Sequence, residues 1–404
     1  MIELSGLRRY VTDRDTARLE ADIKFIDMKE ACPAETMWVE IDANYGGLLV
    51  DDTYDPFMLV ALYLAMYNHT DLKIRGNVSK KLYKNLTWYA QKILCDFSSD
   101  LVPVKIFVDG FAPTNVTGTL IGTGISCGVD SLSTVYDRFV CEDDPDYRLN
   151  ALFFFNCGSN GRGTHDFIPI IAQSRCQRAI ALATELNLPL VPIDTNLHQF
   201  YREEYKDNFL FLSIYACVLA LQNAIRRYYI SSACSYGQIK ANGISFENHD
   251  LASFCESFFV PLIQTERTEL IIDGCQYTRV EKTAKLADWD IAQKYLNVCN
   301  VYSEDSHNCG GCVKCLRTLL ALEILGKLDT FANIFDIERY RSQMMNYKIY
   351  TVMKADEDVF AKELFDLAKK HNFPLPTRRD CYTLGRQVVI VGDNFEMFAD
   401  FNHA

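Results

Sequence analysis

The sequence lacks the excess of positive charge that broad binding of nucleic acids or anionic membranes requires. Lys and Arg number 41 and Asp and Glu number 53 among 404 residues, so the formal net charge at pH 7 is −12. Proteins of both classes need a positive surface, because their partners present phosphate groups. The composition argues against nucleic acid and membrane as general partners, although it is compatible with a local basic patch.

Long apolar runs are also missing. The most apolar stretch runs from Phe209 to Leu221, and it is shorter than the roughly 20 residues that span a bilayer as a helix. The opening residues, MIELSGLRRYVTDRD, contain no apolar core of the kind that a secretory signal needs. We expect a globular, cytoplasmic protein in which the apolar stretch forms a helix buried against a sheet.

Several well-known catalytic motifs are absent. The sequence contains no G-x-S-x-G nucleophile elbow and no H-E-x-x-H metal pair. It also lacks the Walker spacing G-x-x-x-x-G-K-[ST] and the dinucleotide-binding spacing G-x-G-x-x-G. No internal repeat, low-complexity tract or heptad pattern is present.

Cysteine, in contrast, is abundant, with 15 residues. Most stand singly in apolar surroundings, as Cys141 and Cys217 do. We expect a reducing compartment, where disulfides do not persist and where a buried thiol acts as a small hydrophobic group. A cluster near residue 310 does not fit this description.

The middle of the chain alternates apolar runs of strand length with helical stretches. The five expected strands lie in TLIGTGIS, ALFFFNCG, LPLVPIDTN, YYISSACSYG and TELIIDGC. Uninterrupted apolar strands indicate a sheet with both faces covered, and successive β–α units are typical of parallel sheets. The sequence predicts an α/β fold with a doubly wound, parallel, five-stranded sheet.

The length predicts two or three domains. Residues 1–113 are expected to form an α+β domain, in which MWVEIDANYGGLLVDD alternates like strands around a Gly-Gly turn and DPFMLVALYLAMYNHT is typical of an amphipathic helix. The turn-rich segment DGFAPTNVTG marks the first boundary. The α/β domain is expected at 114–330, followed by a mostly helical extension at 331–404 that ends in a strand, RQVVIVGD.

The stretch GTGISCGVDSLST, from Gly122 to Thr134, stands where the first of these strands ends. In open α/β sheets, ligands bind at the carboxyl ends of strands. Small residues in a turn expose backbone N–H groups to an anion, hydroxyl groups add donors, and a carboxylate can help to hold Mg²⁺. The predicted phosphate-binding residues are Ser126, Cys127, Gly128, Asp130 and Ser131. The alternative is an ordinary strand–turn–helix junction capped by Ser and Asp.

A second motif is a cysteine cluster with the spacing C-x9-C-x2-C-x2-C. It contains Cys299, Cys309, Cys312 and Cys315. Thiolates two residues apart can bind one metal from a tight turn, and four thiolates suit a closed tetrahedral Zn²⁺ site that stabilises a loop. An iron–sulfur cluster is the alternative. His307 is not included, because four thiolates already fill the coordination shell.

Together the two motifs resemble a known superfamily. Ser126, Gly128, Asp130 and Ser131 match the S-G-G-x-D-S loop of the N-type ATP pyrophosphatases, with Cys127 where a Gly is usual. Within that superfamily, the four-cysteine segment resembles 7-cyano-7-deazaguanine synthase, a zinc-containing, nitrile-forming enzyme. The resemblance covers residues 118 to 328. A segment of the type D-Y-S-G-Y-P-D-C-R is replaced here by IIDGCQYTRVEK, which indicates a divergent relative.

The resemblance implies a fold of the adenine nucleotide alpha hydrolase type and an ATP-dependent adenylating activity that uses ATP, Mg²⁺ and Zn²⁺. A substrate carboxylate or carbonyl oxygen would attack the α-phosphate and release pyrophosphate, and a nitrogen nucleophile would then displace the adenylate. The substrate would be a 7-deazaguanine-like compound or another carboxylate. Relatives in antiviral operons attach such a group to a protein, so a protein partner and a second copy of the chain are further expected partners.

Arg279 and Lys282 are the predicted catalytic residues. They follow the fifth expected strand and lie three residues apart, so they share one face of a helix. In that position they could neutralise phosphate charge during adenylation. The alternative is a solvated helix start with an ordinary ion pair.

Other residues are weaker candidates for the same site. They are polar groups at the ends of the other strands or in the cysteine segment: Arg162, Asp194, Asn196, Ser232, Ser235, Lys314 and Arg317. For Asp194 and Asn196, a role in the turn itself is the favoured interpretation. Two other functions stay open: a nucleotide-binding sensor or scaffold that has lost catalysis, and a tRNA-modifying sulfur transferase, against which the net charge of −12 counts.

Overall fold

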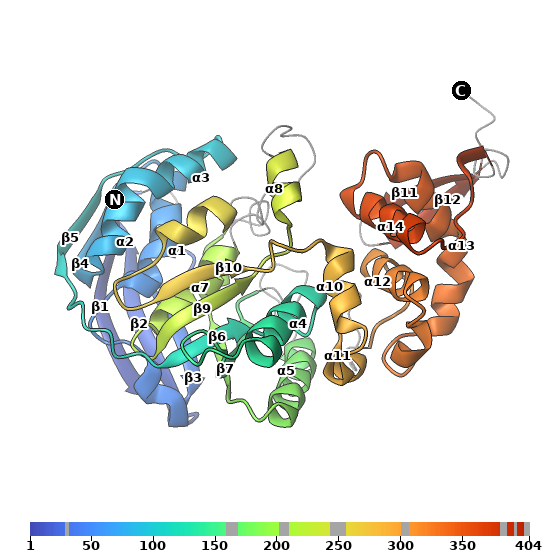
Figure 1. Cartoon of the computed structure of the whole chain (residues 1–404). Helices are drawn as coiled ribbons and strands as arrows, with labels where there is room; N and C mark the ends of the chain where they lie inside the picture. Colours follow the sequence, from blue (N-terminus) through green and yellow to red (C-terminus); the bar gives the residue numbers. More distant parts are fainter. Residues whose placement is uncertain are drawn as a thin grey trace.

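A single ten-stranded sheet runs through the computed structural model (Figure 1). The structure describes residues 1–28, 32–158, 169–201, 210–242, 256–299, 307–379, 386–391 and 394–399. The strand order across the sheet is β10-β9-β6-β7-β8-β3-β2-β1-β4-β5. The strands span Ile2–Val11 (β1), Thr16–Phe25 (β2), Thr36–Asp42 (β3), Leu72–Val78 (β4), Ile106–Phe111 (β5), Leu120–Gly124 (β6), Ala151–Asn156 (β7), Leu190–Thr195 (β8), Ile225–Ser231 (β9) and Glu269–Asp273 (β10).

Five neighbouring strands of this sheet are parallel. Pairing runs from β10 to β9, β9 to β6, β6 to β7 and β7 to β8, so β6, the first of the five in the chain, lies in the middle. Connections leave β6 in both directions, which creates the switch point where open α/β sheets bind ligands. The α/β class and a large, mostly parallel sheet are confirmed.

The extent of the sheet differs from the prediction, which was five strands. The outer parallel strand β8 pairs antiparallel with β3, with Val39 opposite Thr195 and Ile41 opposite Ile193. The strands of residues 1–113 thereby continue the same sheet, and they cover the hydrogen-bonding edge that β8 would otherwise expose. Sequence periodicity does not encode this pairing, because it joins segments about 150 residues apart.

Helices cover both faces of the parallel strands. On one face α1 (Asp55–Tyr67) packs against α7 (Phe211–Ala220), and α2 (Lys80–Asn85), η2 (Leu86–Ala90) and α3 (Gln91–Phe97) lie over the N-terminal strands (Figure 1). Helix α1 was predicted to be amphipathic, but all its residues except Tyr67 are buried. It lies between the sheet and α7, so no face of it meets solvent.

The opposite face of the sheet carries α4 (Val129–Val135), which continues as the π-helical turn η3 (Tyr136–Cys141), and α5 (Pro169–Glu185). Helix α10 (Arg279–Leu286) and helix α11 (Asp290–Tyr295) follow. A second group of helices stands beside them: α12 (Val313–Ile324), α13 (Ile337–Lys354) and α14 (Val359–Lys370) (Figure 1). Helix α10 contacts α4, α12 and α14 and so connects this group to the sheet.

Two local predictions were wrong. Gly46 and Gly47 lie in the 3-10 helix η1 (Ala43–Leu48) and not in a hairpin turn, because β3 finds its partners in β2 and β8. The expected strand YYISSACSYG starts at Tyr228, whereas β9 begins at Ile225, after the preceding helix has ended at Ala220. Most residues of both elements are buried, so their apolar runs look alike in the sequence.

The remaining elements are short. They are η4 (Leu197–Phe200), α8 (Tyr236–Asn242), η6 (Val260–Leu262) and η7 (Leu328–Phe331), together with an antiparallel pair, β11 (Arg386–Val391) and β12 (Asn394–Ala399). Strand β11 matches the strand predicted near the end of the chain. Within the described segments no helix combines the length and hydropathy needed to cross a membrane.

Candidate functional site

The loop between β6 and α4 gathers its polar groups at the carboxyl end of the middle parallel strand. Ser126 Oγ accepts a hydrogen bond from Gly128 N at 3.3 Å and lies 3.2 Å from Ser131 Oγ. Ser131 Oγ also donates to Gly128 O at 3.2 Å. The two hydroxyls that the sequence singled out are thus adjacent and fix the backbone at Gly128.

Cys127 takes a backbone conformation that non-glycine residues rarely adopt, with φ of +61°. Its carbonyl accepts from Asn297 N at 2.8 Å, and its thiol is buried. Burial raises the pKa of this thiol to about 12, so it is protonated at neutral pH. A protonated buried thiol is a poor nucleophile, and Cys127 contributes to the shape of the loop.

Asp130 joins the loop to the two predicted catalytic residues. Arg279 NH1 lies 2.9 Å from Asp130 Oδ2, and Lys282 Nζ lies 3.0 Å from Asp130 Oδ1. Arg279 and Lys282 occupy the first and second turns of α10, behind a capping box formed by Thr278 and Glu281. The expected common helix face exists, and it points at the loop.

Lys282 is buried where three parallel strands end. Its side chain is 1% exposed, and Nζ also donates to Ser232 O at the end of β9. At Gly274, just after β10, a Cβ would stand 3.3 Å from Nζ, and φ is +88°. Strands β6, β9 and β10 therefore converge on one ammonium group.

The other serines predicted for this site form local turns. Ser232 Oγ donates to Cys234 O and accepts from Cys234 N. Ser235 Oγ accepts from Gln238 N, and Ser235 N donates to Gln238 Oε1 at 2.6 Å. Ser232 thus meets Lys282 through its main chain and not through its hydroxyl.

Helix α12 adds two cations on the side of α10. Arg317 is buried, and its guanidinium carbon lies 3.8 Å from the ring centre of Phe360. Lys314, one turn before Arg317, is exposed. Helix α12 begins at Val313, which places both residues in its first two turns.

Sequence reasoning missed two residues of α14. Phe360 stacks with Arg317, and Glu363 Oε2 accepts from Arg279 N at 2.9 Å and from Val280 N at 3.4 Å. The segment VFAKELFDLAKK carries only the pattern of an amphipathic helix, so no local signal marks these two side chains.

The remaining candidates lie elsewhere. Asn196 ties β8 to β3, accepting from Trp38 N at 2.9 Å and donating to Thr36 O at 2.8 Å. Asp194 accepts from Thr195 N and from Asn156 Nδ2, and desolvation raises its pKa to about 6. Arg162 lies outside the described residues.

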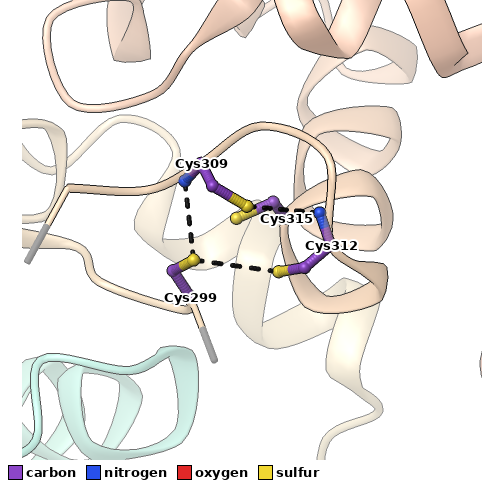
Figure 2. A group of neighbouring side chains, drawn as sticks. All are labelled: Cys299, Cys309, Cys312 and Cys315. Carbon is purple, nitrogen blue, oxygen red and sulfur yellow. Dashed lines mark hydrogen bonds between the residues drawn. The ribbon is translucent and has the colours of Figure 1, made fainter. Parts of the chain in front are cut away.

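The four cysteines of the second motif form one group (Figure 2). All four sulfur atoms lie within 4.8 Å of one another, and Cys299 Sγ is 3.9 Å from Cys312 Sγ. Zn–S bonds of about 2.3 Å in a tetrahedron place sulfur atoms about 3.8 Å apart. The cluster could therefore hold a single metal ion such as zinc, and His307 is not part of it.

The turn between Cys309 and Cys312 depends on its glycines. Gly310 has φ of +67°, and a Cβ there would lie 2.0 Å from Asp336 O. Cys309 N is 3.5 Å from Cys299 Sγ, and Cys312 N is 3.3 Å from Cys309 Sγ. Backbone donors of this kind stabilise thiolate charge.

Asn308 is a further residue that sequence reasoning missed. It is fully buried, and its Oδ1 accepts from Val298 N and Cys299 N. Its Nδ2 donates to Leu296 O and Ile334 O at 2.8 and 2.9 Å. One side chain thereby ties residues 296–299 to the cysteine turn and to the segment just before α13.

Comparisons with protein-family models, with curated proteins and with solved structures gave no match for this chain. The geometry of the two sites is therefore the basis for assigning a function.

Proposed function

We propose that this chain is an ATP-dependent adenylating enzyme that cleaves ATP to AMP and pyrophosphate. The observation that carries the proposal is the double ion pair of Asp130 with Arg279 and Lys282, located at the carboxyl end of the middle parallel strand. It combines a carboxylate that can help to hold Mg²⁺ with two cations suited to phosphate oxygens.

In the proposed reaction, an oxygen of a substrate carboxylate or carbonyl attacks the α-phosphate of ATP, and the bond to the β-phosphate breaks. Pyrophosphate leaves, and a nitrogen nucleophile then displaces AMP from the adenylate. Gly128 N, Ser126 and Ser131 bind phosphate oxygens, while Arg279 and Lys282 stabilise the charge that develops on the leaving group.

The conformation of Cys127 supports this assignment. In the S-G-G-x-D-S loop that this segment resembles, the corresponding position is Gly, the residue that adopts positive φ at least cost. Here Cys127 keeps a φ of +61° despite its side chain. A left-handed residue retained in a loop of this kind indicates that the loop shape is needed.

We further propose that the four cysteines bind Zn²⁺ and that the ion stabilises the connection between α11 and α12. Sulfur atoms this close together suit one tetrahedral ion, whereas a multi-iron cluster spreads its thiolates over several metal atoms. The centre does no chemistry in this proposal. Its effect on the other site is to fix the start of α12, which carries Arg317.

The acceptor in this proposal is a 7-deazaguanine carboxylate or a related acid, and the attachment of such a group to a partner protein is the extension that the resemblance suggests. Both rest on the resemblance of the two motifs. A sulfur transferase would need a reactive thiol at the ATP loop, and the protonated Cys127 does not supply one.

The test is product analysis with ATP labelled at the α-phosphate, in the presence of Mg²⁺, 7-carboxy-7-deazaguanine and ammonium. We expect labelled AMP from the parent protein and a loss on the order of 100-fold in Asp130→Ala. Asp329→Ala is the matched control, because the Asp329 side chain is exposed and its ion pair among the described residues is a loose 3.9 Å contact with Arg341. Formation of ADP, or an Asp130→Ala protein as active as its parent, would contradict the proposal.

A nucleotide-binding module without catalysis is the second candidate. It is favoured by the departure at Cys127, which stands where the loop that this segment resembles has Gly. ATP binding with no AMP formed from any trial acid would support this candidate in place of the enzyme.

A further inference from the structure

We propose that Arg317 is an oxyanion-binding residue and that helix α14 holds it in place for the pyrophosphate part of a nucleotide. The inference deepens the proposed function and rests on it for the identity of the nucleotide. It assigns a role in the site to residues 359–370, which lie in the region predicted only as a C-terminal extension.

Arg317 is a buried cation with a residue exposure of 9%, and in the described part of the chain it makes no ion pair or hydrogen bond. Its guanidinium carbon lies 3.8 Å from the centre of the Phe360 ring. An unpaired buried charge destabilises the folded state, and a bound anion would offset that cost.

Arg279, which lies beside Arg317, also has a hydrogen-bond donor that is not used. NH1 of Arg279 pairs with Asp130, but its Nε is buried and has no hydrogen-bond partner in the described residues. The guanidinium lies 5.9 Å from the same Phe360 ring. Two guanidinium groups, one on α10 and one on α12, thus share one aromatic side chain of α14.

Glu363, one turn after Phe360, fixes α14 against α10. Its Oε2 takes the Arg279 and Val280 backbone N–H groups, and its Oε1 accepts from Gln238 Nε2 at 3.2 Å. The carboxylate therefore occupies the start of α10, and the donors left for a ligand are side chains.

The charges around Asp130 are unbalanced. The four cations are Arg279, Lys282, Lys314 and Arg317, and the carboxylates that act on them are Asp130, Glu363 and Asp358. The remaining excess of positive charge favours an anionic ligand. Guanidinium groups bind phosphate oxygens in pairs of parallel hydrogen bonds, so a diphosphate is the ligand class that this set fits best.

The experiment measures binding of inorganic pyrophosphate by calorimetry, together with the melting temperature with and without pyrophosphate. The variants are Arg317→Met and Phe360→Leu. The control is Lys362→Met, on the exposed side of α14, where Lys362 pairs only with Asp366. We expect the parent and the control to bind alike, Arg317→Met to bind at least tenfold more weakly, and Phe360→Leu about threefold more weakly.

The ligand-free melting temperature separates binding from structure. If Arg317 serves a ligand, removing its unpaired charge leaves the ligand-free protein as stable as its parent or more stable. A structural role predicts the opposite, a lower melting temperature with unchanged affinity. Affinity within twofold of the parent in Arg317→Met, or no binding to the parent, overturns the inference. If Arg317→Met does not fold, the affinity of Phe360→Leu for pyrophosphate tests the inference instead, and a value within twofold of the parent overturns it.

The two proposals can fail separately. If ATP is cleaved to AMP but pyrophosphate affinity does not depend on Arg317, the inference fails and the proposed function stands. If pyrophosphate binds through Arg317 but no acceptor yields AMP, the binding site stands and the proposed reaction fails.

Discussion

At the scale of single residues, Cys127 adopts a left-handed backbone conformation that glycine adopts at the least cost. Its φ of +61° costs about 1 kcal/mol or more for a residue with a Cβ. Burial of the side chain, which is 1% exposed, and the hydrogen bond from Asn297 to its carbonyl offset that cost. The thiol itself is protonated at neutral pH, because burial raises its pKa to about 12.

Two substitutions at Cys127 should therefore behave differently. Cys127→Gly relieves the backbone and loses a small buried group, so we expect stability within about 1 kcal/mol of the parent and unchanged pyrophosphate affinity. Cys127→Val places a β-branched side chain at positive φ, and we expect a loss of about 2 kcal/mol or more and weaker binding. Urea unfolding and calorimetry measure both. Equal stability and equal pyrophosphate affinity in the two variants would show that neither property depends on the φ of residue 127.

At the scale of elements, the turn between Cys309 and Cys312 contains two glycines, Gly310 and Gly311. The space for a side chain is limited by different kinds of atoms at the two positions. A Cβ at Gly310 would meet the backbone oxygen of Asp336 at 2.0 Å, and φ there is +67°. A Cβ at Gly311 would meet Arg339 Nε at 2.4 Å, an atom of a side chain that can move. The obstacle at Gly310 is rigid, whereas the one at Gly311 is adjustable.

We predict that Gly310→Ala loses most of its bound metal and several degrees of melting temperature, because the clash displaces Cys309 or Cys312. Gly311→Ala, the matched control, should keep about one metal ion per chain. Elemental analysis and thermal unfolding give the two readouts. Full metal content in Gly310→Ala would mean that the turn is not tied to the metal centre.

Elements that the sequence predicted well are those coded by local patterns. The five parallel strands follow from apolar runs between helical stretches, and the four-cysteine cluster follows from the C-x2-C-x2-C spacing. The roles of Asn308, Phe360 and Glu363 could not be predicted, because each acts on a segment that the chain brings near only after folding. The pairing of β3 with β8 was missed for the same reason.

At the scale of the whole molecule, residues 1–113 are joined to the parallel strands by more than the sheet. Arg267 pairs with Asp52 at 2.6 Å and donates to Asn223 Oδ1 and to Pro113 O. Asp55, fully buried at the start of α1, accepts from Ser79 N at 2.7 Å and from Gln222 Nε2 at 3.0 Å. These polar contacts cross between segments distant in the sequence and fix how they pack.

Asp55 gives the molecule a predictable dependence on pH. Desolvation raises the pKa of its carboxyl to about 6 from an ordinary value near 4. Between those values the unfolded chain loses the proton and the folded chain keeps it, so stability falls as pH rises through this window and stays lower above it. The size of this effect is on the order of 2 kcal/mol.

Asp55→Asn should remove that dependence. The amide can accept from Ser79 N, and its Nδ2 can donate to Gln222 Oε1, an atom without a partner in the described residues, once the Gln222 amide turns over. We expect the variant to gain stability relative to the parent between pH 4 and pH 7, measured by urea unfolding at both values. A difference between the two proteins that does not change with pH would contradict the assigned titration.

The most direct test of the central claim is a crystal structure of the full chain with a non-hydrolysable ATP analogue and Mg²⁺. We expect the β- and γ-phosphates to lie against Gly128 N and the Ser126 and Ser131 hydroxyls, with Arg279 and Lys282 in contact with phosphate oxygens. A nucleotide bound away from the end of β6, with the Asp130 ion pairs intact and its phosphates in solvent, would contradict it.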